Sequence, residues 1–127
     1  MFKLSKKSRD KLVGVDSKLV SVVERALELS EVDFSVSEGV RSLERQKELV
    51  KAGKSLTMHS KHLTGRAVDV VAYVDGELSW EEKYYHKIAG AFIQAAAELS
   101  VPIRWGGTFK NKDGKPFFDG PHFELVP

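Results

Sequence analysis

Apolar residues recur at helical spacing in two long stretches of the chain. Between residues 17 and 30 they return every three or four positions, which is typical of an amphipathic helix with one face in the core. A second such stretch opens where Ser79 and Glu82 have the spacing of a capping box, and it runs to about Leu99, before Pro102. We expect the buried stripe of this second helix to consist of Tyr84, Ile88, Ala91, Phe92, Ala95 and Leu99.

Short segments rich in apolar and β-branched residues lie between and after these helical stretches, and they predict strands. Residues 33–39 alternate apolar and polar positions, and residues 67–74 form an almost continuous apolar run. The Asp75-Gly76 pair that follows is typical of a hairpin turn. Two more short strands are predicted at residues 103–105 and 122–126.

The remaining segments predict two further helices and two loops. A short basic helix runs from Ser5 to Leu12, and a second helix over residues 42–53 points Leu43, Leu49 and Val50 inward. Residues 54–66 show no periodicity, and residues 106–121 are rich in glycine and proline, so both read as loops. Helices interleaved with short strands and hairpin signals predict an α+β fold, in which helices pack on one side of a small, mostly antiparallel sheet.

Composition narrows the classes of protein that the chain can represent. Its 127 residues predict a single domain, residues 1–127, and 42% hydrophobic with 30% charged residues is ordinary for a globular fold. The absence of cysteine leaves only His, Asp and Glu as ligands for a metal. A net charge of +2 is too weak to predict nucleic-acid binding, but it is compatible with an anionic polymer such as a bacterial cell wall. We expect no membrane span and no signal peptide, because no apolar stretch has the length or position that either needs.

Asp69 interrupts a strand that is otherwise apolar. A period of two places it on the face opposite Val68 and Val70, which we assign to the core. An unpaired buried carboxylate costs several kcal/mol or more, so Asp69 needs a partner. His62 lies on the preceding loop, and Gly65 lets that loop fold back at little steric cost. We therefore expect His62 and Asp69 to converge.

The last strand supplies a complementary set. His122 and Glu124 share one face of it, while Phe123 and Leu125 share the other, which we expect in the core. Asp119 precedes His122 by three positions, and the Gly-Pro pair between them forces a turn that can bring Asp119 over the same face. We interpret Glu124 as a partner of His122 rather than as a catalytic group.

These side chains predict a metal site with catalytic chemistry. His62, Asp69 and His122 form a three-ligand set that suits zinc and leaves one position for water, whose pKa zinc lowers to about 7. Asp119, which is not a ligand in this set, is placed to act as general base and then as acid to a leaving amine. Arg41, just after the first strand, is the candidate cation for a developing oxyanion or a substrate carboxylate.

Two separate motifs carry these residues. They read S-x-H-x-x-G-x-A-x-D over residues 60–69, and W-G-G over residues 105–107 followed by D-G-P-H-F-E over residues 119–124. Together they resemble the D-alanyl-D-alanine carboxypeptidase-like zinc peptidases of the VanY/Hedgehog type. Within these, the likeness is greatest to the small phage endolysins that cut peptidoglycan stem peptides as L-alanyl-D-glutamate peptidases. Residues 25–50 are also similar, so the likeness covers nearly the whole chain.

The resemblance implies a role for each matching residue. It makes His62, Asp69 and His122 the Zn²⁺ ligands, Asp119 the catalytic acid/base, and Arg41 a residue that contacts the transition state or the substrate.

Three further positions bear on substrate binding. By resemblance, Ser60 lies near the substrate, and we expect Trp105 to line or floor the cleft, although a core position is an alternative. Thr108 stands where relatives often have aspartate, so any role of that acid is in doubt here.

The function implied is zinc-dependent hydrolysis of the L-alanyl-D-glutamate bond in the peptidoglycan stem peptide, with zinc-bound water as nucleophile. A monomeric phage endolysin would be made in the host cytoplasm and would act at the host cell wall, in the periplasm, after release through a separate pore. The alternatives are a D,D-carboxypeptidase of the same family and a catalytically silent module that binds cell wall or metal. A silent module has no need of Asp119.

Simpler interpretations exist for single residues. His59 could replace His62 as a ligand, although it has no acid nearby. Asp69 could pair with Arg41 or Arg66 in a structural ion pair, and Asp119 could serve only to form a turn.

Overall fold

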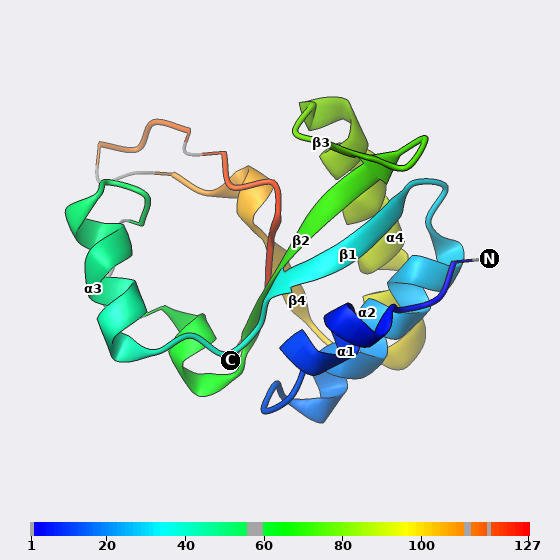
Figure 1. Cartoon of the computed structure of the whole chain (residues 1–127), viewed down its shortest axis with the longest axis horizontal. Coiled ribbons are helices and arrows are strands. Elements are labelled where there is room, and N and C mark those ends of the chain that lie inside the picture. Colours follow the sequence, from blue (N-terminus) through cyan, green and yellow to red (C-terminus); the bar gives the residue numbers. More distant parts are fainter. Residues whose placement is uncertain (1, 56–59, 111–112, 117) are drawn as a thin grey trace.

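The computed structural model describes residues 2–55, 60–110, 113–116 and 118–127. One antiparallel sheet and a layer of helices form the body of the molecule (Figure 1). In chain order the elements are α1 (Lys6–Lys11), α2 (Ser17–Leu29), β1 (Asp33–Glu38), α3 (Leu43–Lys51), the 3₁₀ turn η1 (Lys61–Thr64), β2 (Ala67–Val74), β3 (Glu77–Ser79), α4 (Glu82–Leu99), β4 (Ile103–Trp105), the 3₁₀ turn η2 (Gly106–Thr108) and β5 (His122–Leu125).

The sheet has the strand order β1-β2-β5-β4, and β3 pairs with the end of β2 as a hairpin. All these pairings are antiparallel. Asp69 of β2 is the direct partner of His122 on one side and of Glu38 on the other. Because directly paired residues point to the same face of a sheet, Glu38, Asp69 and His122 stand in one row across three strands. The sheet therefore carries the predicted ligands side by side.

The core lies between the other face of the sheet and three helices. Helix α2 packs against α4, α1 lies against β1, and α4 contacts β2 and β4 (Figure 1). Val68, Val70 and Phe123 are fully buried in this layer, as their alternation predicted. The α+β architecture with helices on one side of a small antiparallel sheet is confirmed. Helix α3 stands apart from this helical layer, beside the loop that follows β4.

The predicted capping box at the start of α4 is wrong. The helix begins at Glu82 with Glu81 at its N-cap and no side-chain cap, because Ser79 is paired with Ala72 in the β2–β3 hairpin. The Tyr85 hydroxyl ties the helix to this hairpin, because it donates to the Ser79 carbonyl at 2.8 Å and accepts from the Ala72 amide at 3.2 Å. The Ser79 hydroxyl accepts from the amide of the N-cap residue Glu81 at 3.3 Å.

Five apolar residues expected in the core are not buried. Tyr84 is only half-buried and its neighbour Tyr85 is buried instead. Leu49 and Val50 are half-buried as well, while Leu99 and Leu43 are 42% and 54% exposed. Periodicity gives the helical phase only to within about one residue, and tertiary packing decides which neighbour faces inward. In α3 the buried position is the polar Gln46. None of the helices in the described residues has the length and apolar content needed to cross a membrane.

Candidate metal centre

Three elements place the candidate ligands. Asp69 and His122 project from paired positions of β2 and β5, and His62 comes from η1. Ser60 caps this turn through a hydrogen bond from the His62 amide, and Gly65 ends it in the left-handed conformation, with φ of 71°. A β-carbon at Gly65 would lie 2.4 Å from the Gly14 carbonyl oxygen. The sequence-based role of Gly65, to let the loop fold back, is therefore borne out by the backbone.

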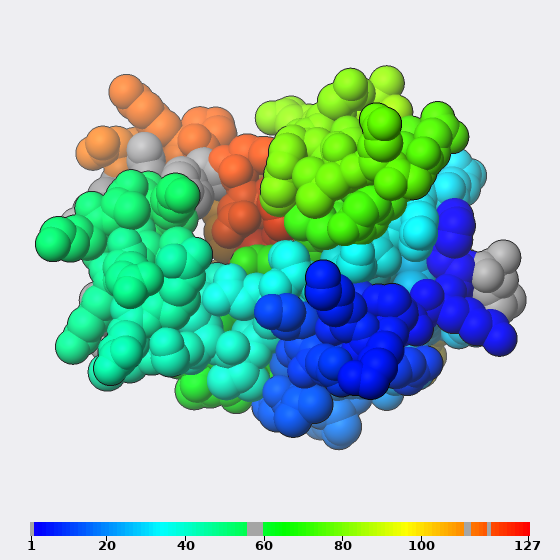
Figure 2. Space-filling model, in the orientation of Figure 1, coloured from blue at the N-terminus to red at the C-terminus, as the bar shows by residue number. Residues whose placement is uncertain are grey.

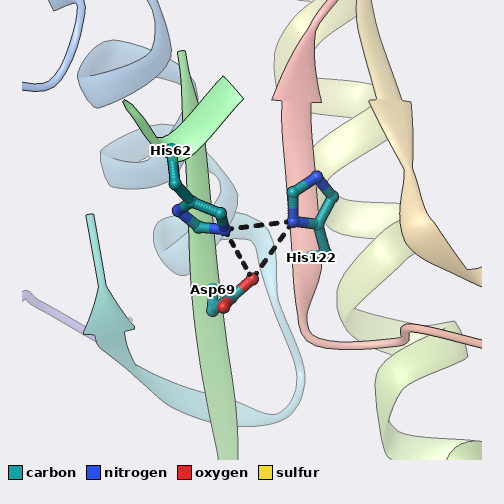
Figure 3. A group of neighbouring side chains, drawn as sticks. All are labelled: His62, Asp69 and His122. Carbon is teal, nitrogen blue, oxygen red and sulfur yellow. Dashed lines mark hydrogen bonds and ion pairs between the residues drawn. The ribbon is translucent and has the colours of Figure 1, made fainter. Parts of the chain in front are cut away.

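The ligand atoms form a nearly equilateral triangle, in which they point toward one another (Figure 3). His62 Nε2 lies 3.2 Å from Asp69 Oδ1 and 3.2 Å from His122 Nδ1, and His122 Nδ1 lies 3.3 Å from Asp69 Oδ1. Tetrahedral zinc with bonds of 2.0–2.1 Å separates its ligands by about 3.3 Å. The triangle thus has the size of three corners of a tetrahedral site.

Hydrogen bonds on the outer side of each imidazole set the direction of its lone pair. His62 Nδ1 lies 2.8 Å from the Gly39 carbonyl, and His122 Nε2 lies 2.8 Å from Glu124 Oε1. Since a carbonyl and a carboxylate only accept, both outer nitrogens are the N–H donors. In the neutral imidazoles, the two inner nitrogens and the carboxylate of Asp69 are then three acceptors facing one point. Such an arrangement requires a positive charge.

The pKa values of His122 and Asp69 are shifted in the directions that favour a positive charge on the imidazole and a negative charge on the carboxylate. Burial opposes the charged form of His122, but hydrogen bonds to Asp69 and Glu124 outweigh it and raise the pKa of His122 to about 9. Burial likewise opposes ionisation of Asp69, but hydrogen bonds from His122 and His62 lower its pKa. Without a metal, a proton on His122 therefore supplies the charge. A cation that binds here would displace that proton.

Arg41 holds the second oxygen of Asp69. Its guanidinium donates twice to Glu38 at 2.8 Å, once to Gln46 Oε1 at 2.7 Å, and once to Asp69 Oδ2 at 3.3 Å. Asp69 thus points one oxygen at the imidazoles while the other is held in place. The alternative that Asp69 pairs with Arg41 is what the structure shows, and this pairing coexists with the ligand cluster.

The cluster opens into a cleft of about 680 Å³ between α3 and the loop after β4. In the space-filling view, the C-terminal segment in red is visible between α3 in teal and the β2–β3 region in green (Figure 2). The candidate residues that line the cleft are Arg41, Ser60, His62, Asp69, Thr108, Asp119 and His122.

Trp105 is not among the described residues that line this cleft. Its ring packs edge-on against His86 and Phe118, and its Nε1 donates to the Gly120 carbonyl at 2.8 Å. Trp105 therefore supports the turn next to Asp119, and its predicted contact with substrate stays a prediction. The alternative ligand His59 lies outside the described residues.

Asp119 reaches the cleft from a turn fastened to β5 and η2. Its amide donates to the Gly106 carbonyl at 3.0 Å, and its carbonyl accepts from the His122 amide at 3.1 Å. Burial raises the pKa of the Asp119 carboxyl, and the negative charge of Asp69 raises it further. Asp119 thus both forms a turn and presents a carboxyl, with raised proton affinity, to the cleft.

Gly106 allows this turn to lie against the sheet. A β-carbon there would lie 2.2 Å from the Asp119 carbonyl oxygen and 3.0 Å from the His122 β-carbon.

We expect Gly106→Ala to lower the free energy of unfolding by about 1–3 kcal/mol and to disturb Asp119 and His122 together, because backbone must move to admit the methyl group. Gly90→Ala is the matched control: it lies within α4 with nothing within 4 Å of the added carbon. It should stabilise the protein by up to about 1 kcal/mol. Urea unfolding of both variants measures this, and equal stability of the two would contradict it.

Sequence reasoning missed three residues that support the ligands. Glu38 and Gln46 hold Arg41, and Lys61 holds Glu124 through an Nζ–Oε2 ion pair of 3.0 Å. Alternation could not have found Glu38, because it assigns Glu38 to the core face with Phe34 and Val36. A β-bulge between Val36 and Glu38 turns its side chain to the face of Asp69 instead. The burial of Gln46 could not be predicted either, since a polar residue in a short helix is expected on the face exposed to solvent.

Comparison with known proteins agrees with this geometry. The sequence model of the family described as phage L-alanyl-D-glutamate peptidase matches residues 1–126. The chain belongs to this family. The L-alanyl-D-glutamate peptidase of Escherichia phage T5 is 33% identical to it, over 98% of this chain and 98% of that protein.

Solved structures extend the comparison to three dimensions. The L-Ala D-Glu endopeptidase ChiX of Serratia marcescens is 48% identical, with a TM-score of 0.88 over 98% of this chain and 90% of that chain. The vancomycin resistance D,D-pentapeptidase VanY, in complex with Zn(II), has a TM-score of 0.60 at 19% identity, over 89% of this chain and 73% of that chain. The second likeness shows a shared fold. The family resemblance predicted from the motifs is confirmed.

Proposed function

We propose that this protein is a zinc-dependent peptidase that hydrolyses the L-alanyl-D-glutamate bond of peptidoglycan stem peptides. The observation that carries the proposal is the triangle of His62, Asp69 and His122, three inward-facing acceptors of tetrahedral size beside the carboxyl of Asp119. Relatives with this peptidase activity in their names match nearly the whole chain. The donor set of two imidazoles and one carboxylate suits zinc and leaves a position open to the cleft.

In this proposal the ligands and Asp119 have separate tasks. Zinc, when bound by His62, Asp69 and His122, acts as a Lewis acid and makes water nucleophilic near neutral pH. Asp119 takes the proton of the attacking water and passes it to the leaving amine. Its raised pKa, caused first by burial, suits a group that must both accept and return a proton.

Arg41 and Ser60 complete the site. Among the residues that the structure describes, Glu38, Gln46 and Asp69 use four of the five N–H groups of Arg41, which leaves one Nη1 donor for the substrate or a developing oxyanion. Ser60 lines the same cleft with its hydroxyl next to His62. Arg41 therefore orients Asp69 and has one donor left for the substrate.

The biological setting follows from the phage relatives. We infer that the protein acts as an endolysin on the host cell wall, and that a monomer reaches the wall after release through a separate pore. Its proposed partner is the stem peptide of peptidoglycan.

Digestion of purified peptidoglycan tests the activity. The protein loaded with one equivalent of zinc should release fragments with a new N-terminal D-glutamate, detected by mass spectrometry, and it should clear chloroform-treated Gram-negative cells. A chelator should abolish both, and added zinc should restore them. Free D-alanine as the product would instead indicate a D,D-carboxypeptidase, and binding without clearing would indicate a silent wall-binding module.

A further inference from the structure

The basic side chains of the cleft are not equivalent. Arg41 and Lys61 line it but are engaged by Glu38, Asp69 and Glu124. Arg104 lines the same cleft, is exposed, and forms no ion pair with any residue that the structure describes. It is a positive charge that the metal cluster and its supporting residues do not use.

The sheet holds Arg104 close to the ligands. It lies on β4 directly opposite Glu124 of β5, so both side chains belong to the face that carries His122. Arg104 is thus the diagonal neighbour of His122, and residues in this relation on adjacent strands are about 7–8 Å apart. An arginine side chain can span most of that distance toward a substrate that is bound at the cluster.

The carboxylate beside Arg104 does not neutralise it. Glu124 places one oxygen on His122 and the other on Lys61, at 2.8 and 3.0 Å. The negative charge of Glu124 is therefore already shared, and in the part of the chain that the structure describes no carboxylate is paired with the guanidinium of Arg104.

The substrate of the proposed reaction carries a matching charge. A D-glutamyl residue has two carboxyl groups, and continuing the peptide uses one of them. One carboxylate thus stays on the residue that supplies the leaving amine, within a few bonds of the scissile nitrogen. A guanidinium is suited to such a group because it binds a carboxylate through two parallel hydrogen bonds.

We propose that Arg104 is a specificity-determining residue that binds the free carboxylate of the D-glutamyl residue. This assignment rests on the proposed peptidase activity. Lys54 and Lys110 also line the cleft, but they extend from loops, whereas Arg104 is held in register within the sheet. Arg104 therefore makes the cleft select an acidic residue after the scissile bond.

Two matched peptides test the assignment. One is N-acetyl-L-alanyl-γ-D-glutamyl-L-lysine with a free α-carboxylate, and the other is the same peptide with that carboxyl converted to the carboxamide. The unmodified protein should cleave the acid with a kcat/KM about 10- to 100-fold above that of the amide, as expected for a charge-assisted hydrogen bond. In Arg104→Gln this ratio should fall to near one, and Arg104→Lys should keep part of it.

Arg45→Gln is the control. Arg45 is an exposed arginine of α3 that pairs with Glu48 and does not line the cleft. This variant should keep the full preference for the acid. A preference that survives in Arg104→Gln, an equal loss on both peptides in that variant, or no preference in the unmodified protein would overturn the role of Arg104. If the unmodified protein cleaved neither peptide, the proposed activity itself would fail, and the role of Arg104 would fail with it.

Discussion

Asp119→Asn is expected to lower kcat by at least about 100-fold while the protein keeps a full equivalent of metal. An asparagine amide cannot take a proton from water, and Asp119 is not part of the His62–Asp69–His122 cluster. The backbone hydrogen bonds that fasten this turn do not depend on the side chain, so the fold should persist. Steady-state kinetics on a stem peptide, with metal analysis of the same sample, measures both quantities.

Asp119→Glu is the matched variant for this prediction. It restores a carboxyl on a side chain one methylene longer, so its activity should lie between those of the unmodified protein and Asp119→Asn. If Asp119→Asn retained full activity, Asp119 would have no part in proton transfer and would serve only as a turn residue. Loss of metal from Asp119→Asn would place it among the ligands instead.

His122→Ala is expected to abolish stoichiometric metal binding. It leaves His62 and Asp69 as two ligands and removes one corner of a triangle whose edges are 3.2–3.3 Å. It also leaves Glu124 without its imidazole partner. Elemental analysis after dialysis against zinc measures the content. A second readout is thermal unfolding, because a metal that binds only the folded state raises its stability. A chelator should therefore lower the Tm of the unmodified protein but not that of His122→Ala.

His86→Ala controls for the loss of any histidine. His86 is exposed and packs against Trp105 and Phe118, away from the ligand triangle. This variant should keep one equivalent of zinc and the effect of the chelator on Tm. A full equivalent of zinc in His122→Ala would contradict the proposed ligand set.

Part of the candidate ligand set could be predicted from local sequence patterns. An acid within the apolar run of β2 demands a partner, and the two-residue period of a strand tells which face Asp69 and His122 occupy. Those rules act over a few residues, and they also gave the α+β class, the core face of β2 and the left-handed turn at Gly65. These rules failed at two points of α4. They predicted a capping box at Ser79, but Ser79 belongs to the β2–β3 hairpin. They also placed Tyr84 in the buried stripe, but tertiary packing buries Tyr85 instead.

The pairing of β2 with β5 could not be obtained in this way. His122 and Asp69 are 53 residues apart, and nothing in either segment specifies that they stand directly opposite one another. The same holds for Arg104 and Glu124, and for the buried Gln46 that holds Arg41. Sequence alone indicated which side chains are candidates for the chemistry and on which face of β2 and β5 they lie, because these depend on local periodicity. Only the tertiary structure decided which of them meet, because strand register and the direction of side-chain hydrogen bonds arise from contacts between distant segments.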